Sequence, residues 1–206
     1  MKNWITSDLH FNHANIIRYC NRPFKSVEEM NEALVNNWNR TVDEEDTVFF
    51  LGDLAFGHDP LSWLELLKGH IVLIKGSHDR FAAQKSLVLH SEGLDLLLIH
   101  DPAEVPQDWH GWVVHGHRHN VDPFFNPVSK RVNVSVEVTN YAPVSVERVV
   151  SMIKSYTQPP PLPKGLTLSP EPKAPKYIRG KGALPSPTRK TTRPSTGVIS
   201  LRRSMR

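Results

Sequence analysis

The sequence predicts an α/β fold, and two observations lead to this prediction. Short apolar runs with the composition of buried strands recur along the chain, at residues 3–7, 47–51, 71–74, 94–99 and 112–114. Segments whose apolar residues follow helical spacing separate several of these runs. Strands interleaved with helices are typical of α/β proteins, whose ligand sites lie on the loops that leave the carboxyl ends of the strands.

The first long helix is predicted over residues 26–40. Ser26 followed by Glu29 has the pattern of a capping box, and the apolar positions after it keep the spacing of one helical face. Ser145 is expected to cap the final helix, which carries apolar residues through Ile153. Other helices are predicted at residues 14–20, 60–68 and 79–89, and residues 131–138 alternate like a strand with one exposed face.

Charge and proline content divide the chain at about residue 157. Residues 1–157 hold 14 Lys and Arg against 20 Asp and Glu, a formal net charge of −6. Residues 158–206 hold 11 Lys and Arg against one Glu, a net charge of +10, together with 10 of the 17 prolines. The second segment has too few large apolar residues to form a core. We therefore predict a folded domain over 1–157 and a Pro-rich, basic, disordered tail over 158–206.

The sequence also predicts where the protein resides. The single cysteine, Cys20, excludes an intramolecular disulfide framework and suits a reducing compartment. The first ten residues, MKNWITSDLH, lack the apolar stretch of a signal peptide, and the longest apolar runs are far shorter than a membrane span. We expect a cytoplasmic protein that does not contact a membrane.

Five of the predicted strands end in side chains of the kinds that bind metal ions. The motifs are Asp-x-His at 8–10, Gly-Asp at 52–53, Gly-Ser-His-Asp at 76–79, a single His at 100 and Gly-His-x-His at 116–119. Carboxylates and imidazoles without a thiolate suit Mn²⁺, Fe or Zn²⁺. Seven candidate ligands exceed the needs of one tetrahedral ion. They fit two ions about 3.5–4 Å apart, which hold a phosphoryl group and activate a water.

In this order, the five motifs resemble those of the calcineurin-like metallophosphoesterases. The pattern of that superfamily is Asp-x-His, Gly-Asp, Gly-Asn-His-Asp/Glu, His and Gly-His-x-His, and the resemblance spans residues 5–119. The stretch SDLHFNHANIIRYCNRPFKSVEEMNEALVNNWN is further similar to short bacterial and bacteriophage members. The resemblance implies two mixed β-sheets packed face to face between helices, and it does not include the tail.

The resemblance also implies a role for each ligand position. Asp8, His10 and His119 would hold the first ion, and Asp53 would bridge both ions. The second site would be completed by His100, His117 and Ser77. His78 would lie beside the substrate and protonate the leaving oxygen or stabilise its charge. The expected cofactors are two divalent ions, Mn²⁺ first, with Fe, Zn²⁺ or Ni²⁺ as alternatives. Ser77 stands where the family has asparagine, which predicts a weaker second site.

Several polar residues near the motifs are candidates for substrate contacts. His13 is expected either to touch the phosphate or to begin the helix at 14–20. Arg80 and Arg118 flank predicted ligands and are expected either to neutralise a phosphate oxygen or to form surface salt bridges. His115 is expected to pack or to form a hydrogen bond. The remaining histidines belong to no motif and are expected on the surface or in loops: His58, His70, His90 and His110.

Together these features predict a metal-dependent phosphoesterase in which two ions activate a water molecule. The first expected substrate is a phosphodiester, such as a cyclic nucleotide or a nucleic-acid end, and the second is a phosphomonoester. One alternative is a non-catalytic interaction scaffold of the same fold with a weakened metal site. The other is a nucleic-acid-binding protein that acts through its tail. The cations of 158–206 would bind nucleic acid without sequence preference, unless the tail has no partner at all.

Overall fold

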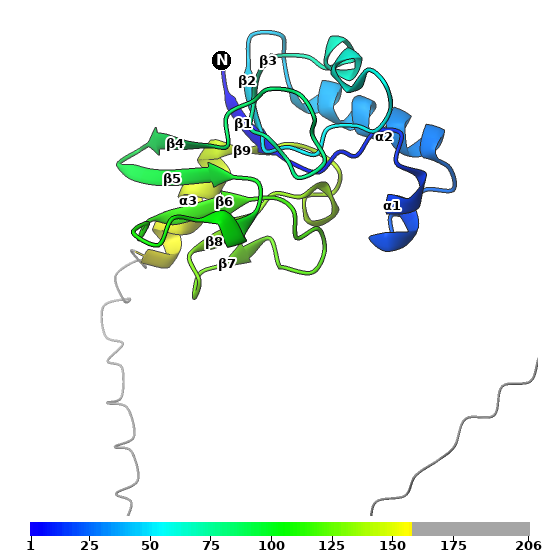
Figure 1. The fold of residues 1–206 in the computed structure, drawn as a ribbon. Helices are drawn as coiled ribbons and strands as arrows, with labels where there is room; N and C mark the ends of the chain where they lie inside the picture. The colour runs from blue at the N-terminus through cyan, green and yellow to red at the C-terminus, as the bar shows by residue number, and fades with distance from the viewer. Residues whose placement is uncertain (158–206) are drawn as a thin grey trace, which may run out of the picture. The chain divides into compact units, whose positions relative to one another are not determined.

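The computed structural model in Figure 1 describes residues 1–157 of the chain. The predicted disordered tail, 158–206, lies outside the described residues. Within the described part, the fold is a mixed α/β architecture with two β-sheets flanked by helices, as the sequence predicts.

The first sheet has the strand order β3-β2-β1-β9. Its three long strands are β1 (Asn3–Thr6), β2 (Thr47–Phe50) and β3 (His70–Leu73), which run parallel to one another. The short strand β9 (Val144–Ser145) pairs with β1 in the antiparallel direction. Because β1, β2 and β3 are parallel, their carboxyl ends all reach the same edge of the sheet.

The second sheet has the strand order β4-β5-β6-β8-β7. Its strands are β4 (Ser86–Ser91), β5 (Leu94–Ile99), β6 (Trp112–His115), β7 (Phe125–Asn126) and β8 (Arg131–Asn133). The three central strands, β5, β6 and β8, are parallel. At each side of the sheet an antiparallel partner closes it, so this sheet is mixed as well.

Among residues 1–157, three α-helices accompany the sheets: α1 (Ala14–Tyr19), α2 (Val27–Thr41) and α3 (Val146–Thr157). In the same range, three 3-10 segments lie at Pro60–Leu66, Pro102–Glu104 and Val136–Val138. The largest core joins both sheets and α3, with fully buried residues such as Ile5, Leu98 and Val150. A second core joins the first sheet to α1 and α2 and includes Phe50 and Trp38. Both faces of the first sheet are therefore packed, which fixes the edge from which the motif loops leave.

Both predicted helix caps are confirmed. The backbone N–H of Glu29 donates to the Ser26 hydroxyl at 3.2 Å, and the Glu29 carboxylate accepts from the backbone N–H of Lys25 at 2.8 Å. Ser145 accepts from the backbone N–H of Arg148 at 3.1 Å at the start of α3. These contacts satisfy N–H groups that have no partner within the helix.

Three predictions of secondary structure are wrong, wholly or in part. The helix predicted at 79–89 is absent, and its second half forms β4, whose alternate residues turn inward and which pairs with β5. The segment predicted as a helix at 60–68 is a 3-10 helix over Pro60–Leu66. The predicted strand 131–138 ends at Asn133, and a 3-10 turn follows at Val136–Val138.

No helix among residues 1–157 is both long enough and apolar enough to cross a membrane.

Candidate metal centre

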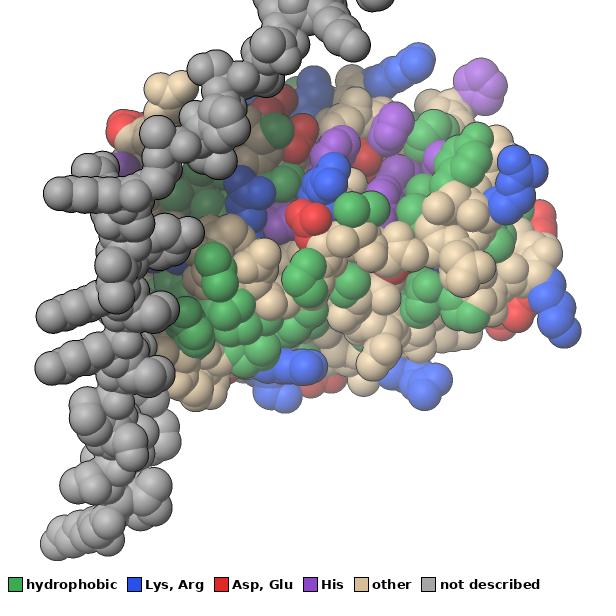
Figure 2. All heavy atoms as spheres, turned by 90° about the horizontal axis from the view of Figure 1, so that it is seen from below, with side chains coloured by type: hydrophobic (Ala, Val, Ile, Leu, Met, Phe, Trp, Pro, Cys, Tyr) green, Lys and Arg blue, Asp and Glu red, His purple; other side chains and the backbone are tan. Residues whose placement is uncertain are grey.

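The loops that carry the motifs meet at the carboxyl ends of β1, β2 and β3 in the first sheet and of β5 and β6 in the second. Histidine side chains gather on one part of the surface drawn in Figure 2. Six of the seven predicted ligands form two groups, and within each group the ligand atoms lie within 4.8 Å of one another. The groups are Asp8, His10 and His119, and then Asp53, His100 and His117.

The first group surrounds the buried carboxylate of Asp8. Its Oδ1 atom lies 3.8 Å from His10 Nε2 and 3.9 Å from His119 Nε2. The other oxygen, Oδ2, accepts hydrogen bonds from the Ser135 hydroxyl at 2.9 Å and from the His117 backbone N–H at 2.9 Å. These bonds hold the carboxylate so that one oxygen remains directed at the two imidazoles.

The second group lies around Asp53. His100 Nε2 is 3.4 Å from Asp53 Oδ2, and His117 Nδ1 is 3.2 Å from His100 Nε2. The same Asp53 oxygen is 3.5 Å from His10 Nε2, a member of the first group. One carboxylate oxygen therefore faces both groups, which is the position that a bridging ligand needs.

The Nε2 atom of His10 indicates whether the site can accept a cation. His10 is 1 % exposed, and its Nε2 atom has no hydrogen-bond partner among the described residues. A buried polar atom in this state is costly unless something binds it. Because this nitrogen faces two carboxylates, the residues present fit a divalent cation.

The backbone is strained at five of the six grouped residues. Their φ angles are positive, in the left-handed region that residues other than glycine rarely adopt: Asp8 62°, His10 53°, Asp53 59°, His117 66° and His119 45°. Such strain persists only where the surrounding structure enforces it, and it concentrates at functional sites. The loops thus hold the backbone of these residues in conformations that are unfavourable in isolation.

Close backbone packing explains two of the motif glycines. A Cβ atom at Gly76 would lie 2.2 Å from the backbone N and from Oδ1 of Asp53. A Cβ atom at Gly116 would lie 2.0 Å from the Ser7 hydroxyl and 2.4 Å from Asp8 Oδ2. Only glycine fits at these positions, because any larger residue would displace the carboxylates.

Hydrogen bonds to the far nitrogen orient two of the imidazoles. His100 Nδ1 donates to the Leu51 carbonyl at 2.7 Å, and His119 Nδ1 donates to Glu137 Oε1 at 3.0 Å. Each bond leaves the Nε2 atom directed at the centre of the site. Metal-binding histidines usually have such a partner on the second nitrogen.

Arg22 and Glu137 support the site, although no sequence motif points to either residue. Arg22 is buried and donates to the carbonyls of Asp8 at 2.7 Å and Leu9 at 2.9 Å. It also forms an ion pair with Glu137 Oε1 at 2.7 Å, the oxygen that accepts from His119. The two residues are 115 positions apart, so no local pattern could reveal the pair.

Asp79 also supports the site, and it could have been found in the sequence as the fourth residue of the Gly-Ser-His-Asp motif. It is buried and accepts from the backbone N–H groups of Asp53 at 2.9 Å, Leu54 at 3.1 Å and Gly76 at 2.8 Å. Its carboxylate joins the loop after β2 to the loop after β3. Asp79 therefore positions Asp53 without facing the centre itself.

The pKa values of the grouped residues are shifted. Burial lowers the pKa of His100, but Asp53 and Asp8 raise it more, to about 9. Burial likewise lowers the pKa of His119, while Cys20 and Glu137 raise it to about 10. Burial raises the pKa of Asp8, but neighbouring histidines hold it far below its usual range. The site without metal therefore favours charged imidazoles beside ionised carboxylates.

Ser77 and His78 lie at the solvent side of the second group. Ser77 is exposed, and its hydroxyl is 3.3 Å from His117 Nδ1. The backbone N–H of His78 donates to Asp53 Oδ1 at 2.8 Å. The His78 side chain is 54 % exposed, with Nε2 3.9 Å from Asp53 Oδ2. His78 therefore stands where an incoming molecule can contact it.

Of the remaining candidates, His13 and Arg80 lie where a substrate could reach them, whereas Arg118 and His115 have partners within the protein. His13 borders the site, with its Nδ1 atom 3.4 Å from His10 Nδ1, and it is also the residue that precedes α1. Arg80 is exposed and lines a hollow together with His78. Arg118 forms an ion pair with Asp122 at 3.4 Å, which is the salt-bridge alternative. His115 is buried and bonds to the Gly116 carbonyl at 2.8 Å, as expected.

The two mixed sheets and the described helices have the α/β architecture that the sequence predicts. The sequence is 48% identical over 162 residues to the uncharacterized protein MJ1445 of Methanocaldococcus jannaschii, and the match covers 74% of this chain and 92% of that protein. The chain therefore belongs to the same family as MJ1445.

Two further comparisons cover less or are more distant. The Gene 66 protein of Mycobacterium phage L5 is 36% identical over 81 residues, which are 37% of this chain and 39% of that protein. The protein of unknown function AQ665 from Aquifex aeolicus has a similar structure, with a TM-score of 0.57 and 23% identity over 74% of this chain and 99% of that one. This likeness concerns the fold alone. No protein-family model matches the sequence.

Proposed function

We propose that the protein is a metal-dependent phosphoesterase that uses two divalent ions. The observation that carries this proposal is the position of Asp53 Oδ2, 3.5 Å from His10 Nε2 and 3.4 Å from His100 Nε2. A carboxylate shared by two ligand groups is typical of sites that hold a pair of ions. The unpartnered Nε2 atom of His10 supports the same proposal.

Each group of residues would hold one ion. Asp8, His10 and His119 would bind the first ion, and the second would be bound by His100 and His117, with Asp53 shared. When bound, a pair of divalent ions polarises a phosphoryl group and supplies a nucleophile from water at neutral pH. Mn²⁺ is our first candidate because the ligands are carboxylates and imidazoles.

His78 would assist the departure of the leaving group. Its side chain is half exposed and faces Asp53 from the solvent side. An imidazole at this position can donate a proton to the leaving oxygen of a phosphoester, or stabilise the charge that develops there. A phosphodiester is our first candidate substrate, and a phosphomonoester is the second.

Hydrolysis of bis(p-nitrophenyl) phosphate and of p-nitrophenyl phosphate tests the proposal. The wild-type protein should hydrolyse the diester with added Mn²⁺ and should lose this activity in excess chelator. Asp53→Asn should abolish turnover, because it weakens the binding of both ions together. Asp108→Asn, a change at an exposed aspartate that belongs to none of the motifs, should keep full activity. Full activity in Asp53→Asn would contradict the proposal, and no turnover by the wild type would favour a non-catalytic scaffold.

A further inference from the structure

Two hollows of similar size border the site and share part of their walls. Each has a volume of about 530 Å³, and both are lined by Phe56 and His78. The rings of these two residues lie with their centroids 5.3 Å apart. The residue proposed to act at the leaving group thus stands between two spaces that can each hold part of a substrate.

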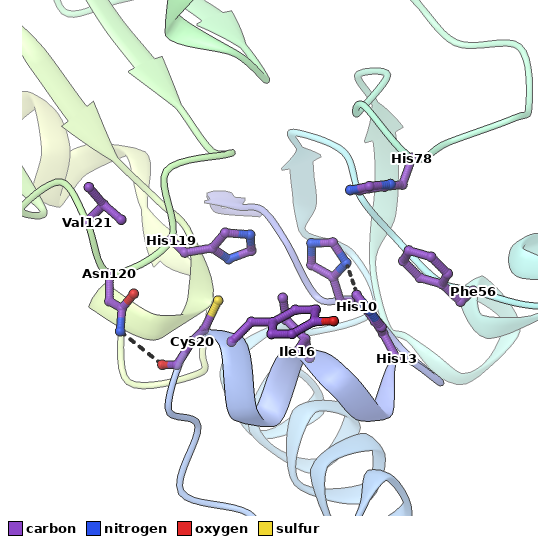
Figure 3. A pocket seen from close by; sticks show the side chains of 10 residues that line it. His10, His13, Ile16, Cys20, Phe56, His78, His119, Asn120 and Val121 are labelled. Atoms are coloured by element: carbon purple, nitrogen blue, oxygen red, sulfur yellow. Dashed lines mark hydrogen bonds between the residues drawn. The ribbon is translucent and has the colours of Figure 1, made fainter. Parts of the chain in front are cut away.

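The first hollow, which we term the apolar pocket, has hydrophobic walls. They are formed by Ile16, Tyr19, Phe56 and Val121, and none of the residues that line the pocket is Lys, Arg, Asp or Glu. Figure 3 shows Val121 on one side of the pocket and Phe56 on the other. The side chains away from the ligand histidines are mostly apolar, so an uncharged ring would find hydrophobic contacts there.

The apolar pocket opens directly onto the candidate metal centre. His10 and His119, both members of the first ligand group, line it together with His78. Figure 3 shows the rings of His10 and His119 directed toward the same space. On the opposite wall, the rings of Phe56 and His13 pack with centroids 4.2 Å apart. A flat ring bound there would find an aromatic surface and would place an attached phosphate at the metal ligands.

The second hollow, which we term the polar pocket, differs in its chemistry. It is lined by polar groups from Ser77, Arg80 and His58 in addition to His78. Arg80 supplies an exposed guanidinium, which suits oxygen-rich or anionic groups. The two pockets therefore favour substituents of opposite character on the two sides of His78.

We infer that the site is built for a phosphodiester with two unlike substituents, of which one is an uncharged aromatic ring held in the apolar pocket. This inference rests on the proposed function and specifies its substrate class. A diester carries two substituents and can fill both pockets, whereas a monoester fills one. The volume of the apolar pocket lies within the range of small-molecule sites and accommodates a single aryl or nucleobase group.

Calorimetric titration in the presence of Mn²⁺ tests the inference with three probes: diphenyl phosphate, dimethyl phosphate and phenyl phosphate. The test variant is Val121→Glu, which introduces a carboxylate into the wall of the apolar pocket. The matched control is Val128→Glu. Val121 is 70% exposed and Val128 is 91% exposed, so neither change removes a core contact. The ratio of the affinities for diphenyl and dimethyl phosphate cancels any charge repulsion that acts on both diesters alike.

Diphenyl phosphate should bind the wild type at least about tenfold more tightly than dimethyl phosphate, a difference of about 1.4 kcal/mol. It should also bind more tightly than phenyl phosphate. Val121→Glu should lower the diphenyl-to-dimethyl ratio at least threefold, by introducing an uncompensated charge beside the ring. Val128→Glu should leave the ratio unchanged. A wild-type ratio near one, equal effects of the two variants, or tighter binding of phenyl phosphate would overturn the inference.

Turnover of bis(p-nitrophenyl) phosphate by the same protein separates this inference from the proposed function. Turnover together with a wild-type ratio near one would overturn the inference and leave the phosphoesterase proposal intact. A high ratio that depends on Val121, without turnover, would contradict the phosphoesterase proposal and support the apolar pocket as a binding site.

Discussion

At the scale of single residues, the candidate metal ligands owe their proximity to where their strands end. The ligand positions stand in short motifs at strand ends, where a few neighbouring residues carry the whole signal. Six of the seven predicted ligands meet in two groups because parallel strands deliver their carboxyl ends to one edge. Arg22 and Glu137 could not be predicted, because their contact depends on two segments that only the folded chain brings together.

Ser77 leads to a prediction about the second ion. A serine hydroxyl is a weaker metal ligand than an asparagine carbonyl oxygen, and it extends less far from the backbone. Ser77 Oγ lies 3.3 Å from His117 Nδ1. We expect Ser77→Asn to tighten the second ion about 10–100-fold and to leave the first unchanged, by analogy with disturbed metal shells. Calorimetry with Mn²⁺ checks this, with Ser151→Asn on an exposed face of α3 as the control. An unchanged Mn²⁺ titration in Ser77→Asn would contradict it.

The raised pKa values of His100 and His119, about 9 and about 10, predict how metal affinity depends on pH. Both imidazoles are protonated at pH 7 in the chain without metal, and a protonated imidazole cannot bind an ion. Raising the pH from 7 toward 9 reduces this competition, so Mn²⁺ affinity should increase and binding at pH 7 should release protons. Calorimetry in buffers of different ionisation enthalpy measures this release. An affinity that is independent of pH would refute the prediction.

At the scale of elements, the segments that differ from their predicted structure do so for physical reasons. The segment 79–89 contains residues compatible with a helix, but Leu87 and Leu89 alternate with exposed residues and pair across to β5. This alternation is a strand signal that is short enough to be confused with a helical one. The strand expected at 131–138 stops early, yet Val132, Val134 and Val136 are all fully buried. The alternation of buried and exposed residues in this segment could be predicted, whereas the end of the strand at Asn133 could not.

Glu137 connects three segments of the chain around the candidate site. Its Oε1 atom accepts from His119 and from Arg22, which joins the turn at Val136–Val138 to the loops after β6 and α1. Glu137→Gln should weaken metal binding about 10–100-fold, because the amide no longer fixes the His119 imidazole through a charged bond.

Metal titration and thermal unfolding of Glu137→Gln distinguish positioning from simple destabilisation. A role in positioning His119 predicts weakened metal binding even at temperatures where the variant is fully folded. Glu147→Gln, an exposed glutamate on α3, should behave as the wild type. Loss of thermal stability with unchanged metal affinity would assign Glu137 a structural role alone.

At the scale of the whole molecule, the division of charge predicts that the two segments can be separated. Residues 1–157 carry a net charge of −6 and residues 158–206 a net charge of +10. A chain that ends at Thr157 should remain folded, show one cooperative thermal transition and hydrolyse a small chromogenic diester at the wild-type rate. It should lose any affinity for nucleic acid at low salt, because phosphate contacts depend on cations. Unfolding of the shortened chain would place the domain boundary elsewhere.

The proposed two-metal site requires Asp53 to bind both ions, and anomalous scattering from crystals soaked in Mn²⁺ tests this most directly. The predicted result is two Mn²⁺ peaks, both within bonding distance of the Asp53 carboxylate, one beside His10 and His119 and the other beside His100 and His117. Both peaks should weaken in Asp53→Asn crystals treated in the same way. A single peak that Asp53 does not contact, or no peak among these residues at saturating Mn²⁺, would contradict the account.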